Sequence, residues 1–98
     1  MKEIKSKEEI KGNTLLYFTA KWCGPCVMAR PVIEEVEKEN EKEIEFVKID
    51  VEENPEIAAE YRIRTVPNIL LIKEGRVEEQ LVGAVNKKTL KEKISSIF

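Results

Sequence analysis

Residues 22–26 read WCGPC and contain the only two cysteines of this 98-residue chain. They directly follow an apolar, β-branched run at Thr14–Thr19, which is typical of a central strand covered on both faces. They directly precede an amphipathic pattern that extends from Cys26 to about Asn40 and predicts a helix. The WCGPC stretch therefore links a buried strand to the start of a helix.

The two cysteines have the spacing of a redox-active dithiol. Thiols three residues apart at a helix start lie on the same side of its first turn, close enough to form a disulfide. Cys23 would lie at or near the N-cap, where free backbone N–H groups and the helix dipole favour a thiolate and lower the pKa of the thiol. We therefore predict that Cys23 is the nucleophile and that Cys26, one turn further in and shielded, is the resolving thiol. Gly24 leaves room beside the sulfur for a substrate chain, and Pro25 has the fixed φ suited to the first helical position.

The rest of the chain alternates strand and helix patterns. A strand, a helix and a second strand in this order imply a right-handed crossover between parallel neighbours, and the last two strands form an antiparallel hairpin. We expect one α/β domain over residues 1–98, with a mixed sheet of about five strands flanked by about four helices. The remaining predicted elements are strands at 2–4, 44–51, 68–73 and 77–82, and helices at 6–11, from 54 to about 61, and after 86.

The overall composition excludes several classes of function. The net charge is only −2, and no basic cluster is interleaved with aromatic residues, so we expect no nucleic-acid partner. The N-terminal residues lack the apolar core of a secretory signal, and no stretch approaches the ~20 apolar residues that a membrane span requires. We therefore expect a cytoplasmic protein that acts away from the membrane.

A Cys-x-x-Cys pair can also be half of a zinc or iron–sulfur site that a second chain completes. Structural zinc requires four ligands, and this chain has two cysteines and no histidine. The absence of histidine also excludes a Cys–His nucleophile within the chain. We predict no metal centre.

Beyond residues 22–26, the chain resembles the thioredoxin family over nearly its whole length. Pro31 matches a kink in the helix after the motif, and Lys48 matches a lysine beneath the site. The segment 63–67, which ends at Pro67, matches a loop with a cis-proline, and Gly83 matches a glycine of the substrate-docking rim. This resemblance implies the thioredoxin fold.

The resemblance also implies where substrates dock. Val66 and Pro67 would pack beside Cys23, with a cis peptide bond before Pro67, and the backbone of Val66 would pair with an extended substrate segment. The implied docking rim is apolar and tolerant of many partners. Its residues are Trp22, Gly24, Pro25, Thr65, Val66, Pro67 and Gly83.

The function that the resemblance implies is a protein-disulfide reductase. The Cys23 thiolate would form a mixed disulfide with a substrate protein, and Cys26 would then release the reduced substrate. The chain would bind no cofactor and would carry electrons only in a reversible Cys23–Cys26 disulfide. No Gly-rich dinucleotide fingerprint is present, so electrons would come from a flavin-containing thioredoxin reductase that draws on NADPH or ferredoxin. We expect a monomer that acts on varied protein disulfides.

Two other functions fit the sequence less well. A glutaredoxin-like or oxidising member of the same fold would use the same dithiol, and Gly24-Pro25 speaks against it by resemblance. A non-catalytic binding subunit would use the thioredoxin fold without its chemistry, and the intact dithiol speaks against that function.

The chain departs from the thioredoxin pattern at three positions. Tyr17 stands where thioredoxins usually carry a buried aspartate, Thr19 replaces a common tryptophan, and Val27 replaces a common lysine. A carboxylate of pKa near ~4 can take a proton from the resolving thiol, whereas a phenol near ~10 is neutral at pH 7. We expect Cys26 to lose its proton through water, with Tyr17 as a relay and Lys48 stabilising the thiolate.

Overall fold

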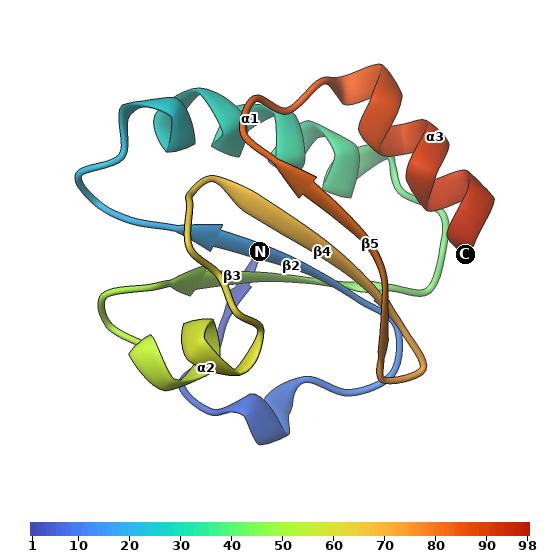
Figure 1. Ribbon diagram of the computed structural model, residues 1–98. Helices are drawn as coiled ribbons and strands as arrows, with labels where there is room; N and C mark the ends of the chain where they lie inside the picture. The colour runs from blue at the N-terminus through green and yellow to red at the C-terminus, as the bar shows by residue number, and fades with distance from the viewer.

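A computed structural model describes all residues, 1–98, and contains one mixed five-stranded sheet in the order β1-β3-β2-β4-β5 (Figure 1). β1 and β2 both pair with β3 in parallel, and β4 joins β2 and β5 in antiparallel ladders. The mixed α/β sheet predicted from the sequence is confirmed. The elements are β1 (Lys2–Glu3), β2 (Thr14–Thr19), α1 (Gly24–Glu39), β3 (Glu45–Asp50), α2 (Pro55–Glu60), β4 (Asn68–Lys73), β5 (Arg76–Val82) and α3 (Lys87–Ile97).

Helices cover both faces of the sheet. Helices α1 and α3 lie over one face and α2 lies over the other (Figure 1). Leu15 and Tyr17 of β2 pack in the core on the α1/α3 side, whereas Leu16 and Phe18 pack in the core on the α2 side. Because both faces of β2 are covered, the strand is a continuous apolar run instead of an alternating pattern.

The helix predicted at residues 6–11 is wrong in length and type. Only a 3₁₀ turn forms, at Lys7–Glu9, although the capping box is present and the Glu9 carboxylate accepts a hydrogen bond from the backbone N–H of Ser6 at 3.1 Å. None of its residues is buried, so the turn has no apolar face to pack, and short helices are not stable without packing. The protein therefore has three α-helices, not about four.

Helix α1 holds the two cysteines at its start and is fixed along its length. It continues through Pro31, and its side chains Ala29, Ile33 and Val36 are buried against the sheet. Near its end, Glu39 accepts hydrogen bonds from Lys87 and Lys91 of α3, at 2.6 and 2.7 Å. These two hydrogen bonds lower the pKa of Glu39 to about 2, so the contact between α1 and α3 stays charged at neutral pH.

Candidate active site

The two cysteines form a disulfide at the first turn of α1. Cys23 is the N-cap residue in extended conformation, and its Cα lies 5.3 Å from that of Cys26. The backbone N–H of Cys26 donates a hydrogen bond to Cys23 Sγ at 3.2 Å. A helix N-terminal N–H aimed at the sulfur stabilises negative charge on it, so the geometry favours a thiolate at Cys23 after reduction.

Exposure does not distinguish the two cysteines. Cys26 is 3% exposed, as expected for a shielded residue, but Cys23 is only 4% exposed. In the disulfide form the two sulfur-bearing residues are thus equally covered. They differ in the hydrogen bond that the Cys26 N–H donates to the Cys23 sulfur. Gly24 and Pro25, which directly follow Cys23, are exposed.

The loop before β4 lies beside the disulfide. The Val66–Pro67 peptide bond is cis, and Val66 packs against the small cluster that contains both cysteines. Neither the N–H nor the C=O of Val66 takes part in any hydrogen bond of the structure. The backbone of Val66 is therefore available to a partner chain.

Gly83 is tied to the same loop. Its backbone N–H donates to the Pro67 carbonyl at 3.0 Å, directly after β5 ends. Its φ of 89° lies in the left-handed region, which residues with a Cβ rarely adopt. Of the other residues predicted for the docking rim, Thr65 is exposed, and its carbonyl accepts a hydrogen bond from the Asn68 side chain at 3.3 Å.

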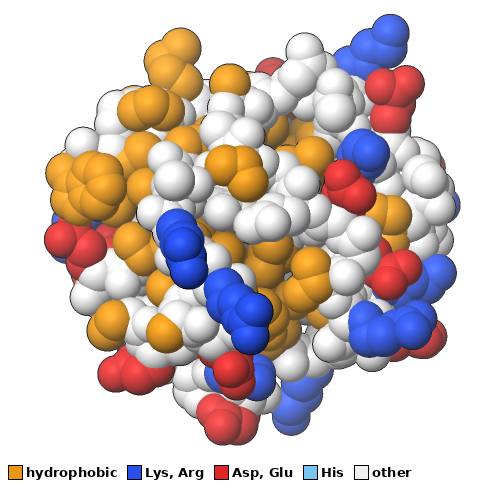
Figure 2. Space-filling model, in the orientation of Figure 1, with side chains coloured by type: hydrophobic (Ala, Val, Ile, Leu, Met, Phe, Trp, Pro, Cys, Tyr) orange, Lys and Arg blue, Asp and Glu red, His pale blue; other side chains and the backbone are white.

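Exposed apolar side chains gather around the start of α1. Figure 2 shows hydrophobic side chains over the connection between β2 and α1, which lies on the left in Figure 1. Trp22, Val27 and Met28 are 69%, 68% and 75% exposed. The sequence analysis predicted Trp22 in the docking rim but not Val27 or Met28. The sequence did contain a signal for these two residues, because Val27 and Met28 fall outside the buried helix face that contains Ala29 and Ile33. Exposed apolar patches of this kind mark contact surfaces.

Tyr17 reaches α1 from the central strand. Its hydroxyl donates to the backbone carbonyl of Cys26 at 2.9 Å and lies 3.4 Å from Thr19 Oγ1. Burial raises the pKa of Tyr17 above its ordinary value, against the hydrogen bond with Thr19, so the phenol is neutral at pH 7. The hydroxyl contacts the Cys26 backbone and not the Cys26 sulfur, so the structure gives no direct contact for the predicted relay.

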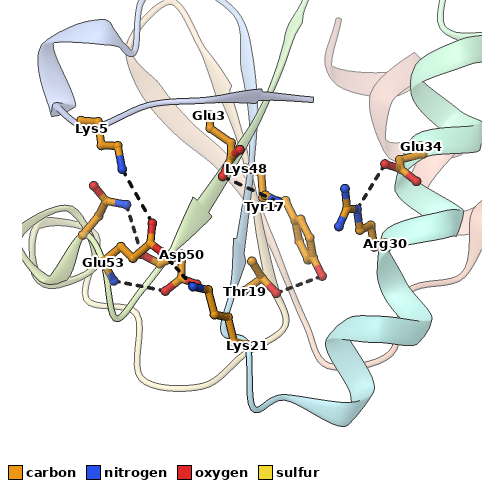
Figure 3. Close-up of polar contacts among 11 residues, drawn as sticks. Glu3, Lys5, Tyr17, Thr19, Lys21, Arg30, Glu34, Lys48, Asp50 and Glu53 are labelled. Carbon is orange, nitrogen blue, oxygen red and sulfur yellow. Dashed lines mark hydrogen bonds and ion pairs between the residues drawn. The ribbon is translucent and has the colours of Figure 1, made fainter.

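Lys48 lies on the same side of the sheet as Tyr17. The two residues are paired neighbours on β3 and β2. The Lys48 side chain is largely covered, and its ammonium forms an ion pair with Glu3 of β1 at 3.7 Å (Figure 3).

A cavity of about 360 Å³ adjoins this part of the site. Its wall brings together Cys26, Tyr17 and Lys48 with Glu3 and Asp50, which come from three neighbouring strands and from α1. The structure thus places Lys48 and Tyr17 on a polar cavity behind the disulfide, whereas Trp22 and Val66 lie beside a separate pocket of about 300 Å³.

No three histidine, cysteine, aspartate or glutamate residues lie close enough together to hold a metal ion. No helix combines the length and the apolar character needed to cross a bilayer.

Comparison with known proteins gives one consistent family. The family model described as Thioredoxin matches residues 2–96. Thioredoxin from Pyropia yezoensis is 45% identical over 87 residues, which cover 86% of this chain and 81% of that protein. Thioredoxin from Bacillus subtilis (strain 168) is 42% identical over 90 residues, which cover 92% of this chain and 86% of that protein.

A solved structure agrees with the sequence comparisons. A mutant thioredoxin from Halobacterium salinarum NRC-1 superposes with a TM-score of 0.87 at 33% sequence identity. The match covers 97% of this chain and 88% of that one, so nearly all of the fold described above is shared.

Proposed function

This chain belongs to the thioredoxin family and is a protein-disulfide reductase, and from that premise we propose how its residues divide the reaction. Cys23 is the nucleophile and Cys26 is the resolving thiol. The observation that carries this assignment is the hydrogen bond from Cys26 N–H to Cys23 Sγ at the N-cap of α1, since it favours the thiolate at Cys23 alone.

The reaction proceeds in two exchanges. The Cys23 thiolate attacks one sulfur of a substrate disulfide, the substrate S–S bond breaks, and the other substrate sulfur leaves with the electron pair. The Cys26 thiolate then attacks Cys23 Sγ, the mixed disulfide breaks, and the second substrate sulfur leaves as a thiolate. The substrate gains two electrons, and the chain is left as the Cys23–Cys26 disulfide seen in the structure.

The oxidised chain must be reduced again from outside. Members of this family generally work with thioredoxin reductase and with disulfide substrates. We assign the donor to a flavoprotein thioredoxin reductase that draws on NADPH or ferredoxin. A reducing compartment such as the cytoplasm suits a carrier that must return to the dithiol form.

Substrate binding rests on the rim beside the disulfide. Its accessible apolar residues are Trp22, Val66 and Gly83, and Pro67 lies buried next to Val66. The unpaired N–H and C=O of Val66 pair with an extended substrate segment as one more strand would. Because backbone pairing does not depend on the side chains of the substrate, this surface can accept varied proteins.

Backbone pairing predicts a specific effect of methylating the substrate. In a disulfide peptide, N-methylation of the amide that pairs with Val66 C=O removes one hydrogen bond and should reduce kcat/KM about fivefold, since such a bond contributes roughly 1 kcal/mol and ~1.4 kcal/mol is tenfold. The measurement is steady-state reduction of a set of peptides methylated one amide at a time around the cysteine. The methylated amides that lie outside the paired register serve as controls and should cost little. Equal rates for all peptides would show that Val66 does not pair with the substrate.

A further inference from the structure

The resolving step requires a base that the two-cysteine scheme does not supply. A thiol with the ordinary pKa of about 8.5 is mostly protonated at pH 7, so Cys26 must lose a proton before it attacks. Tyr17 is the nearest titratable side chain by contact, but its phenol is neutral and its hydroxyl donates to the Cys26 carbonyl. The base therefore has to come from elsewhere on the cavity that Cys26 lines.

Besides the neutral Tyr17, the cavity wall carries six charged residues. They come from β1, from β3, from α1 and from the segments that follow β2 and β3. These residues are Glu3, Lys21, Arg30, Lys48, Asp50 and Glu53. Three of them are carboxylates, and only a carboxylate among them can accept a proton from a thiol at neutral pH.

Two of the three carboxylates have two partners each. Asp50 Oδ1 accepts backbone N–H hydrogen bonds from Glu52 and Glu53, at 2.8 and 3.1 Å. The Glu53 carboxylate forms ion pairs with Lys5 and Lys21, at 3.7 and 3.3 Å. Figure 3 shows Asp50 and Glu53 beside Lys5 and Lys21.

Glu3 is the carboxylate that remains. Its one partner is Lys48, at 3.7 Å, whereas Asp50 and Glu53 have two partners each. Glu3 pairs with Lys48 across β1 and β3, and Lys48 pairs with Tyr17 across β3 and β2. The three side chains therefore form a row along the cavity (Figure 3), and the Tyr17 hydroxyl at the end of the row donates to the backbone carbonyl of Cys26.

We propose that Glu3 of the edge strand β1 is the general base for Cys26 and acts through water in the cavity. The proposal rests on the function proposed above and deepens it. The Cys26 Sγ–H proton passes through water to the Glu3 carboxylate, which becomes a carboxylic acid. The resulting Cys26 thiolate forms the S–S bond to Cys23, and the substrate sulfur leaves with the electron pair of the broken bond. Lys48 positions the carboxylate.

The test isolates the second exchange. Reduced protein reacts with excess dithiobis(nitrobenzoate), which releases one coloured thiolate when Cys23 attacks and a second when Cys26 resolves the mixed disulfide. Stopped-flow absorbance gives the rate of the second release between about pH 6 and about pH 9, across the ordinary thiol pKa. In the unsubstituted protein this rate should change little near neutral pH, because proton transfer to a nearby general base does not require the thiol to be ionised beforehand.

Glu3→Gln should give a different pH profile. At pH 7 the second release should slow by about tenfold or more, because only about 3% of a thiol with a pKa of about 8.5 is ionised at that pH. It should then rise about tenfold per pH unit until the pH approaches the thiol pKa of about 8.5, where both proteins converge. Glu3→Asp keeps a carboxylate and should restore much of the flat profile.

A matched variant controls for loss of a surface ion pair. Glu45→Gln removes an exposed strand glutamate that pairs with Lys2 at 3.9 Å and does not line the cavity, and its profile should equal that of the unsubstituted protein. A Glu3→Gln profile that superposes on the unsubstituted one, or an equal change in Glu45→Gln, would overturn the assignment of Glu3.

Cys26→Ser tests the underlying scheme separately: a second release at an undiminished rate would overturn the two-cysteine mechanism itself.

Discussion

Cys23→Ser should abolish multiple-turnover reduction of protein disulfides, with a loss on the order of 10³-fold or more, as expected when the nucleophile of a covalent mechanism is removed. A serine hydroxyl stays protonated at pH 7, so the helix N-terminus at Cys23 no longer holds an anionic nucleophile. Cys26 cannot substitute for it, because the hydrogen bond that favours a thiolate is donated to Cys23 Sγ and not to the Cys26 sulfur. The measurement is the reduction of a protein disulfide with dithiothreitol as electron donor.

The control for this experiment is the folded state of the variant. Serine and cysteine have nearly the same size, so the thermal unfolding midpoint of Cys23→Ser should equal that of the reduced unsubstituted protein. If a well-folded Cys23→Ser protein kept a tenth or more of the activity, the nucleophile would not be Cys23.

Cys26→Ser should convert the reductase into a trap. The Cys23 thiolate still attacks, because its position at the N-cap of α1 does not depend on the second sulfur. The mixed disulfide then persists, since no internal thiolate can attack Cys23 Sγ. Incubation with a disulfide-containing protein should give a covalent one-to-one complex that non-reducing gels and intact-mass measurement detect and that added thiol dissolves.

Turnover provides the complementary measurement for Cys26→Ser. Without an added thiol, each molecule should react once and stop, so the released substrate thiol should not exceed one equivalent per chain. Sustained multiple turnover under these conditions would contradict the assignment of Cys26 as the resolving thiol. Cys23→Ser should give no complex at all, which separates the two roles.

The sequence predicted the sheet and the start of α1 because the relevant signals there are local. The apolar run at 14–19 has the same first and last residues as β2, and every position up to Phe18 is buried. Asn86 caps α3 as expected and accepts a hydrogen bond from Thr89 N–H at 3.0 Å. Asn54 begins α2 without a side-chain cap, and its amide instead donates to the Asp50 carbonyl at 3.2 Å.

The N-terminal helix shows the limit of local signals. The capping box at Ser6 and Glu9 is real, yet whether a helix continues depends on packing, and no residue of this turn is buried. The cis bond before Pro67 shows the same limit, because only about 5 to 6% of X-Pro bonds are cis and no local pattern predicts this one. Only the family resemblance implied it.

The contacts behind the disulfide could not be predicted from the sequence. Glu3 and Lys48 lie far apart in the chain and meet because β1 pairs with β3 in a particular register. The sequence analysis identified Tyr17 as unusual but could not show that its hydroxyl binds the Cys26 carbonyl. Such long-range contacts depend on the pairing register of the strands. A shift of one residue would turn the side chains of a strand to the other face of the sheet.

The reduction potential of the Cys23–Cys26 couple decides whether this chain reduces or oxidises protein disulfides. Trp22, the only tryptophan, is adjacent to Cys23 and 69% exposed, so its fluorescence can report the redox state in defined thiol buffers. For a two-electron couple, 30 mV corresponds to about 1.4 kcal/mol, so modest differences decide the direction of electron flow. A protein-disulfide reductase should have a potential well below that of the glutathione pool, which biochemical extraction places at about −220 to −260 mV. A potential at or above that of the pool would contradict the account and favour an oxidising or glutaredoxin-like function.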